Sequence, residues 1–174
     1  EGVQAVEREM APKLAAFSDQ ITQNAKLFER IAAVYETREK AGLTPEQQRL
    51  TWLYYTNFVR AGARLDADAK QRLSAINQSL AELFTRFGQN VLKDENEGVI
   101  FIEKEADLAG LPQAVRDGMA QVAEARGQKG KWAIANTRSS VEPFLTYADN
   151  RALREQAWRM FVNRGDNGGA TDNN

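Results

Sequence analysis

Two short runs of β-branched and aromatic residues interrupt a sequence that otherwise has helical spacing. The first run is Val99–Ile102 and the second covers residues 132–137. A helix-like segment ending near residue 126 lies between them, and helical spacing resumes over residues 139–164. Because strands must pair to satisfy their backbone groups, we expect a small two-stranded sheet with helices packed around it.

Apolar residues recur every three or four positions over the first 91 residues, as they do on one face of an α-helix. Pro12 lies inside the first such stripe and predicts a kink or a restart of the helix. A break is expected at residues 22–24, after which the pattern continues to Tyr35. The first stripe consists of Val3, Val6, Met10, Leu14, Phe17 and Ile21.

The next two helices have clear start sequences. Thr44 is a good N-cap, Pro45 suits the first helical position, and Gln47 completes a capping box. Asp66 caps a longer helix with an apolar face extending to Val91. We expect this long helix to pack as a hairpin against the preceding one and to break at residues 94–98.

Three further helices are predicted after the first strand-like run. Pro112 suits the first turn of one, a short helix starts at residues 139–143, and Asn150 caps the last. The predicted fold class is mainly α: one helical lobe with antiparallel helix hairpins and a small two-stranded β element. We expect a helical N-terminal region at 1–97, the strand pair with its packing helices at 98–164 in the same lobe, and a loop at 165–174.

Composition excludes several classes of function. The 174 residues include 43% hydrophobic residues, enough for a sizeable core, and the formal net charge of -1 favours neither nucleic acid nor an anionic membrane. The longest strongly apolar run, at 99–102, is too short to span a bilayer. The first residues have neither the basic start nor the apolar core of a signal peptide.

Histidine and cysteine are both absent from the sequence. Without them the chain cannot build the usual zinc, copper and iron sites, nor a Ser-His or Cys-His nucleophile. A disulfide framework is excluded for the same reason.

Two acidic stretches have some features of calcium-binding loops. Residues 94–98 place oxygen ligands at alternating positions, but Gly98 comes one position too early and the distal Glu would fall at Glu105. A solvated helix-to-strand turn is therefore the favoured interpretation. Residues 166–172 offer Gly, Asn and Asp without a ligand register, which indicates a linker.

Two other stretches suggest chemistry only weakly. The carboxylates at 103–107 are sequence neighbours, whereas a paired acid and base must face each other across a cleft, so a solvated surface is favoured. Residues 127–132 are too short for a phosphate loop and precede a strand, which favours a turn.

The remaining candidates for binding residues are the tryptophans and the arginines near the end of the sequence. Trp52, Trp132 and Trp158 lie on apolar stripes or strands and are expected in the core. The arginines near the end could face an acidic ligand or a partner domain, but surface pairing with Glu142, Asp149 and Glu155 is the plainer interpretation. These arginines are Arg138, Arg151, Arg154, Arg159 and Arg164.

An ordered set of short segments resembles the N-terminal half of the M3 (thimet oligopeptidase-like) zinc metallopeptidase family. The segments are residues 27–31, 58–65, 99–102, 107–112, 132–137, 143–145, 150–155 and 161–165. The first two are most similar to the bacterial peptidyl-dipeptidase branch. The similarity extends over essentially the whole chain.

The resemblance implies a helical enzyme whose two lobes flank a deep channel. In that family H-E-x-x-H and a later Glu hold zinc, with the Glu of H-E-x-x-H as general base, and peptidyl-dipeptidases release C-terminal dipeptides. Nothing in this sequence matches those residues, so we assign no catalytic, cofactor-binding or metal residue and leave the substrate-binding residues open. The chain is expected to form a wall of the channel and, alone, to bind no zinc and cleave nothing.

The same resemblance implies short peptides and a missing C-terminal catalytic half as partners, with neither nucleic acid nor a membrane among them. It implies a bacterial protein of the cytoplasm, with the periplasm as the alternative. Glu1 already lies in helical rhythm and residues 168–174 show no closing element, so we expect a piece of a longer protein. Some apolar stripes should then be exposed and promote self-association.

Two other classes of function remain open at the level of sequence. A non-enzymatic helical interaction module would offer a groove between paired helices to a partner. A helical sensor would need an internal pocket left unfilled by the apolar helix faces.

Overall fold

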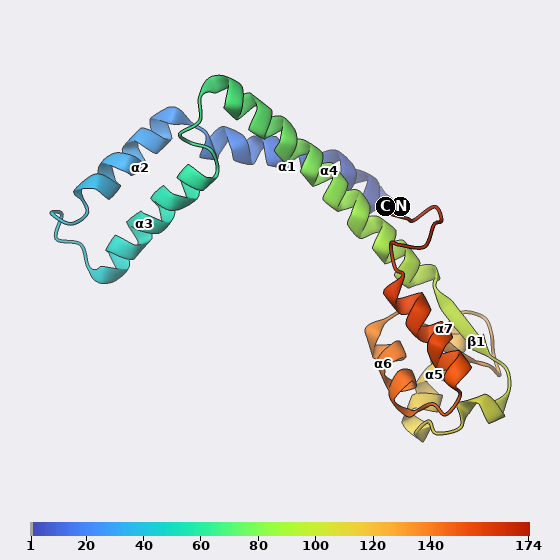
Figure 1. Cartoon of the computed structure of the whole chain (residues 1–174). Coiled ribbons are helices and arrows are strands. Elements are labelled where there is room, and N and C mark those ends of the chain that lie inside the picture. Colours follow the sequence, from blue (N-terminus) through green and yellow to red (C-terminus); the bar gives the residue numbers. More distant parts are fainter. Residues whose placement is uncertain (1) are drawn as a thin grey trace. The chain divides into compact units, whose positions relative to one another are not determined.

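The structure is a computed structural model that describes residues 2–174. Figure 1 shows a mostly helical chain with one small sheet. The chain divides into two compact units, Glu1–Arg86 and Phe87–Asn174. Strands β1 (Val99–Ile102) and β2 (Trp132–Ala135) pair antiparallel. The predicted mainly α fold class with a two-stranded β element is confirmed.

The first unit contains α1 (Gly2–Thr22), α2 (Ala25–Thr37), α3 (Pro45–Arg60) and the start of α4 (Ala67–Glu97). Helix α1 runs through Pro12 without the restart that we considered. The predicted break follows Thr22, where Asn24 caps α2 by accepting a hydrogen bond from the Leu27 N–H at 2.9 Å.

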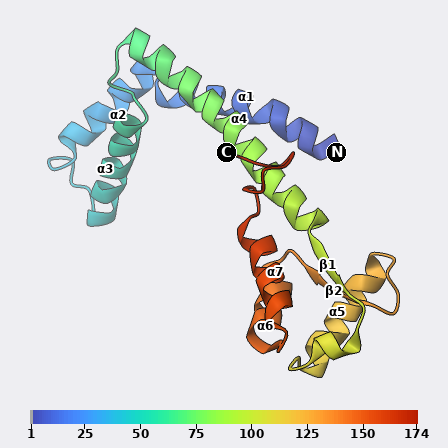
Figure 2. The same cartoon turned by 45° about the vertical axis from the view of Figure 1, so that its right-hand side comes forward.

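Helices α2 and α3 form a hairpin and lie side by side in Figures 1 and 2. The Tyr55 ring of α3 stacks on Tyr35 of α2, with ring centroids 4.0 Å apart, and on Phe28 at 5.7 Å. We predicted a hairpin between α3 and α4, and this was wrong: α3 packs against α2 instead. The aromatic face of α3 is already occupied by α2, which leaves little of it for α4.

The N-terminal caps of α3 and α4 were predicted correctly, whereas the C-terminal end of α4 was not. The Thr44 and Gln47 side chains form the expected capping box, and Asp66 accepts from the Ala69 N–H at 2.8 Å. Helix α4 continues through residues 94–97, where we expected a break. Residues 94–97 contain neither Gly nor Pro, and the Gly98 N–H still donates to the Asp94 carbonyl at 2.9 Å.

The apolar stripe of α1 faces solvent. Val3 is 84% exposed, and the one residue of α1 that is buried is Asp19. The stripe that predicted the helix therefore does not form a core within the described residues. Its exposed members are Val3, Val6, Met10, Leu14, Phe17 and Ile21.

The second unit is built around the sheet. Ile100 of β1 lies opposite Ile134 of β2. Helices α5 (Gln113–Ala125) and α6 (Arg138–Tyr147) both pack on β2. Helix α7 (Arg151–Val162) packs on α6. A 3₁₀ turn at Glu105–Leu108 joins β1 to α5. The buried cluster consists of Ile102, Leu108, Leu111, Met119, Ile134, Val141, Phe144, Ala148 and Ala157.

The three tryptophans have different environments. Trp132 is half-buried against the core cluster, in line with its expected core position, whereas Trp52 is half-buried under the Arg49 guanidinium, 4.1 Å from the ring centroid. Trp158 is 49% exposed, so its predicted core position was wrong. Its neighbour Ala157 takes the inward position on α7, which turns Trp158 outward.

Gly110 permits a close approach that fixes the turn before α5. Its φ of +84° suits glycine, and a Cβ there would lie 2.2 Å from the carbonyl oxygen of Tyr147. The Asp149 N–H donates to the Ala109 carbonyl at 2.9 Å beside it. The segment before α5 is thereby joined to the connection between α6 and α7.

Replacing Phe144 by Ala should destabilise the second unit by about 3–5 kcal/mol, because the ring is fully buried and its removal leaves a cavity. Urea unfolding followed by tryptophan fluorescence tests this. Tyr147→Ala on the same helix is the control, since Tyr147 is exposed and its loss should cost less than about 1 kcal/mol. Equal losses in the two variants would contradict the assigned core.

Candidate functional site

The most densely bonded polar site of the second unit is centred on the Asp94 carboxylate, in the last turn of α4. Its Oδ2 accepts hydrogen bonds from the Gly165 N–H and from Asn167 Nδ2, each at 2.7 Å. Its Oδ1 accepts from the Thr171 hydroxyl. Hydrogen bonds to an ionised acceptor are about twice as strong as neutral ones, so this half-buried group holds three points of the segment 165–174.

The backbone around Asp94 connects α4 to the end of the sheet. The Asp94 carbonyl accepts from Asn136 Nδ2 at 3.2 Å, and the Asn136 N–H donates to the Gly98 carbonyl at 3.1 Å. Asn136 is buried directly after β2, and its Oδ1 has no hydrogen-bond partner. A Cβ at Gly98 would lie 2.8 Å from the Asn136 Cβ, so glycine is required at this approach.

Arg164 adds an ion pair beside this site. Its Nη1 lies 2.8 Å from Glu95 Oε2, and its Nε donates to the Phe161 carbonyl at 3.2 Å. The guanidinium carbon lies 4.2 Å from the centroid of the Phe161 ring. Both charged groups are partly buried, so the pair is screened less by solvent than a surface pair.

The segment 165–174 is folded back on itself. Gly165 has a φ of +73°, and its carbonyl accepts from the Asn173 N–H at 2.9 Å, while Asn90 of α4 donates to Asn173 Oδ1 at 2.8 Å. Backbone N–H groups of Asn174 and Gly168 donate to the Asp172 carboxylate and lower its pKa. Residues 165–174, where we expected a loop, form turns held by these hydrogen bonds. Residues 94–97, which we expected in a solvated helix-to-strand turn, are the last residues of α4.

This arrangement serves to hold structure rather than to perform chemistry. All three hydrogen bonds to the Asp94 carboxylate come from the chain itself, so the group acts as a structural acceptor. Over residues 2–174 no three acidic side chains come together as a group able to hold a metal ion. In that same part of the chain, no helix is long and apolar enough to cross a membrane.

The other predicted charge clusters lie at the surface. Lys131 Nζ lies 2.6 Å from Glu103 Oε1, and the hydrogen bond and charge of Lys131 lower the pKa of Glu103. Arg138 pairs with Glu142 at 2.8 Å, as we expected. Glu155 pairs with Arg159, which follows it by one turn, also at 2.8 Å.

Arg154 and Arg164 do not pair with the expected carboxylates. Arg154 donates to the carbonyls of Ala148 and Asp149 rather than to a carboxylate, and Arg164 pairs with Glu95 from α4. Both arrangements depend on how segments distant in sequence fold together, which the local charge pattern does not contain.

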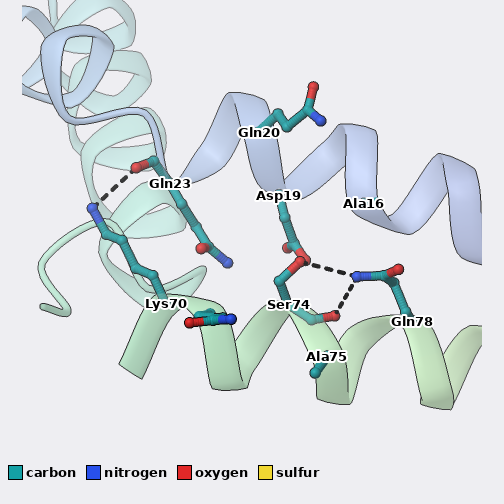
Figure 3. A pocket seen from close by; sticks show the side chains of 9 residues that line it. Ala16, Asp19, Gln20, Gln23, Lys70, Ser74, Ala75 and Gln78 are labelled. Carbon is teal, nitrogen blue, oxygen red and sulfur yellow. Dashed lines mark hydrogen bonds between the residues drawn. The ribbon is translucent and has the colours of Figure 1, made fainter. Parts of the chain in front are cut away.

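A pocket of about 620 Å³ lies between α1 and α4 in the first unit (Figure 3). Figure 3 shows Asp19 and Gln23 directed toward α4, whereas Gln20 points away. Asn77 Nδ2 donates to Asp19 Oδ1 at 2.8 Å, and Lys70 Nζ donates to the Gln23 carbonyl at 3.0 Å. Asp19 Oδ2 and Gln23 Nε2 are buried and have no partner.

This α1–α4 pocket joins two helices through polar contacts. Gln23 directly follows α1 and its N–H donates to the Asp19 carbonyl at 2.9 Å, so the unpartnered acceptor and donor lie one turn apart. Most of the lining residues are polar or charged. They are Ala16, Asp19, Gln20, Gln23, Lys70, Gln71, Ser74, Ala75 and Gln78.

Comparison with known proteins relates the chain to peptidases, although no family model matches it. It is 30% identical over 170 residues to a dipeptidyl carboxypeptidase of Escherichia coli (strain K12). The aligned region covers 98% of this chain and 25% of that protein. Identity to the dipeptidyl carboxypeptidase of Salmonella typhimurium is 31% with the same coverage. An oligopeptidase A of Haemophilus influenzae is 32% identical over 166 residues, covering 93% of this chain and 24% of that protein.

All of these relatives are peptidases by name. Over nearly its whole length the chain is similar to members of the M3 peptidase family. It spans about a quarter of the length of the curated relatives that it matches.

Replacing Asp94 by Ala should release the segment 165–174, because three donors lose their acceptor. We expect the Gly165 amide to exchange its hydrogen faster by a factor equivalent to about 1–3 kcal/mol. Hydrogen exchange followed by NMR measures this directly. Glu97→Ala is the control, since Glu97 is exposed in the same turn and its nearest cation, Lys93, is 4.0 Å away. Unchanged exchange at Gly165 in the Asp94 variant would contradict the assignment.

Proposed function

We propose that this chain is the N-terminal, channel-forming lobe of a zinc-dependent peptidase that removes C-terminal dipeptides from short peptides. The observation that carries the proposal is similarity along nearly the whole chain to proteins named dipeptidyl carboxypeptidase, each about four times as long. An oligopeptidase A that is also about four times as long as this chain matches as well. This match supports peptides as the substrate class.

The residues of this chain do not fit a zinc site. The sequence has no His or Cys, and the described part of the chain brings no suitable acidic group together. In the proposed enzyme the zinc ligands and the general base therefore come from residues outside this chain. The role left for this lobe is to shape the space that the peptide enters, and we expect no cleavage by the lobe alone.

The exposed face of α1 supports a partner within the same protein. Six apolar side chains follow one another along this helix without forming a core, from Val3 to Ile21. Monomeric proteins rarely expose contiguous apolar surfaces of this kind, and covering them is favourable. We propose that the catalytic half of the parent enzyme covers this face, and that the parent enzyme acts in the bacterial cytoplasm.

The reading frame beyond the codon for Asn174 tests the proposal first. It should continue into H-E-x-x-H and a later Glu, and the full-length protein should contain about one zinc per chain and release dipeptides from the C-terminus of short peptides. The 174-residue chain should do neither under the same conditions. A stop codon directly after Asn174, or a full-length protein without peptidase activity, would leave a helical interaction module as the better description.

Charged residues on the α1 face should reduce self-association of the isolated chain. In the double variant Leu14→Lys and Phe17→Lys, two exposed apolar side chains of the face become charged and resist burial. Sedimentation velocity over a concentration series should show the parent chain associating and the variant remaining monomeric. The control is Ser18→Lys with Gln20→Lys, which adds the same charge at exposed polar positions of α1. Equal effects of both double variants would mean that net charge, and not the apolar face, governs association.

A further inference from the structure

An open hollow of about 510 Å³ lies on the second unit, away from the residues around Asp94. Leu145 of α6 lines it together with four residues of α7, namely Arg151, Arg154, Glu155 and Trp158. We call this surface the Trp158 hollow. It combines an exposed aromatic ring with two cations, which is the composition enriched at binding surfaces.

Trp158 supplies apolar area that nothing in the second unit covers. The side chain is 49% exposed, although Ala157 beside it is fully buried. The Arg159 guanidinium carbon lies 5.9 Å from its ring centroid, and Leu145 is partly buried at the wall of the hollow. An apolar group laid on this ring would leave water at little cost in ordering, because the indole has only two rotatable bonds.

Arg154 presents a guanidinium that is already held in position. Its Nη1 donates to the Ala148 carbonyl and, at 3.3 Å, to the Asp149 carbonyl. The other N–H groups of the fork remain available for an acceptor. Binding an anion there would therefore cost little side-chain entropy.

Arg151 adds a second cation, and the one acidic residue of the hollow is compensated. Within residues 2–174 the Arg151 side chain makes no hydrogen bond or ion pair. Glu155 is paired with Arg159 at 2.8 Å. The hollow therefore carries a net positive charge, and it is complementary to a carboxylate.

The spacing of these residues limits the shape of the ligand. Arg151 and Arg154 are one turn apart on α7, and Trp158 is one further turn along the same face. Residues one turn apart on a helix have Cβ atoms roughly 5–6 Å apart, so the two arginines and the indole line one stretch of the helix surface. At the C-terminus of a peptide the carboxylate and the last side chain leave the same Cα, so one residue can present both groups to this stretch.

We propose that the Trp158 hollow binds the free C-terminus of a peptide whose last side chain is apolar or aromatic. The carboxylate lies between Arg151 and Arg154, and the last side chain packs on Trp158. The proposal rests on the proposed function only in that peptides with free C-termini are the substrates of the proposed parent enzyme. Binding itself is a property of the present chain and can be measured on it alone.

NMR titration of the 15N-labelled 174-residue chain tests the proposal. The three tryptophans give separate indole N–H signals, and Trp158→Phe identifies the one from the hollow. The ligand is acetyl-Ala-Ala-Phe with a free carboxylate, compared with the same peptide ending in an amide. We expect a saturable shift of the Trp158 signal with the acid and binding weaker by about tenfold or more with the amide.

Two arginine variants test the contribution of the cations. Arg151→Gln should weaken binding of the acid by about tenfold, and it should fold normally because Arg151 has no internal partner to lose. The control is Arg138→Gln, which removes an arginine with a side chain that is 79% exposed and paired with Glu142 outside the hollow. This control should bind as tightly as the parent chain.

Three results would overturn the proposal. The amide could bind as tightly as the acid, the shift could appear at Trp52 or Trp132 instead, or an amidated peptide with an internal Glu could bind as well as the free C-terminus. The last result would indicate a surface for the acidic side chain of another protein. Dipeptide release by the full-length protein is scored separately, so loss of that activity would refute the proposed function without affecting these shifts.

Discussion

The second unit depends on the hydrogen bonds that the Asp94 carboxylate accepts, because they hold the segment 165–174 against the end of α4. One ionised side chain at the end of α4 accepts from Gly165, Asn167 and Thr171, and its own backbone carbonyl accepts from Asn136 at the end of β2. The helix end, the sheet and the final segment are thereby held by a single residue. Since Gly165, Asn167 and Thr171 would each need another acceptor, removing the carboxylate affects these three donors together.

The two units use their apolar residues differently. In the second, Phe144, Ile134 and their neighbours are fully buried around the sheet. In the first, α1 exposes its apolar stripe and buries Asp19, which bonds to Asn77 of α4. A helix with its apolar face in water gains little from packing within its own unit, and this is the physical reason to expect further polypeptide on that face.

The chain is similar to M3 peptidases along nearly its whole length, and its sequence contains neither His nor Cys. We therefore propose that the zinc chemistry of the parent enzyme lies outside this chain, and that the α1 face and the Trp158 hollow serve assembly and peptide binding. The α1 face and the Trp158 hollow are separate surfaces with different chemistry. One is purely apolar, whereas the other combines a ring with two guanidinium groups.

Features that depend on neighbours in the chain follow from the sequence alone. Caps at Thr44, Asp66 and Asn150 and the two strands were predictable, because a cap bonds within one turn and a strand is indicated by its own residues. The pairing of Asp94 with Gly165, about 70 residues away, and the outward position of Trp158 depend on tertiary contacts. Periodicity shows that a helix has an apolar face, but what covers that face depends on how distant segments fold together.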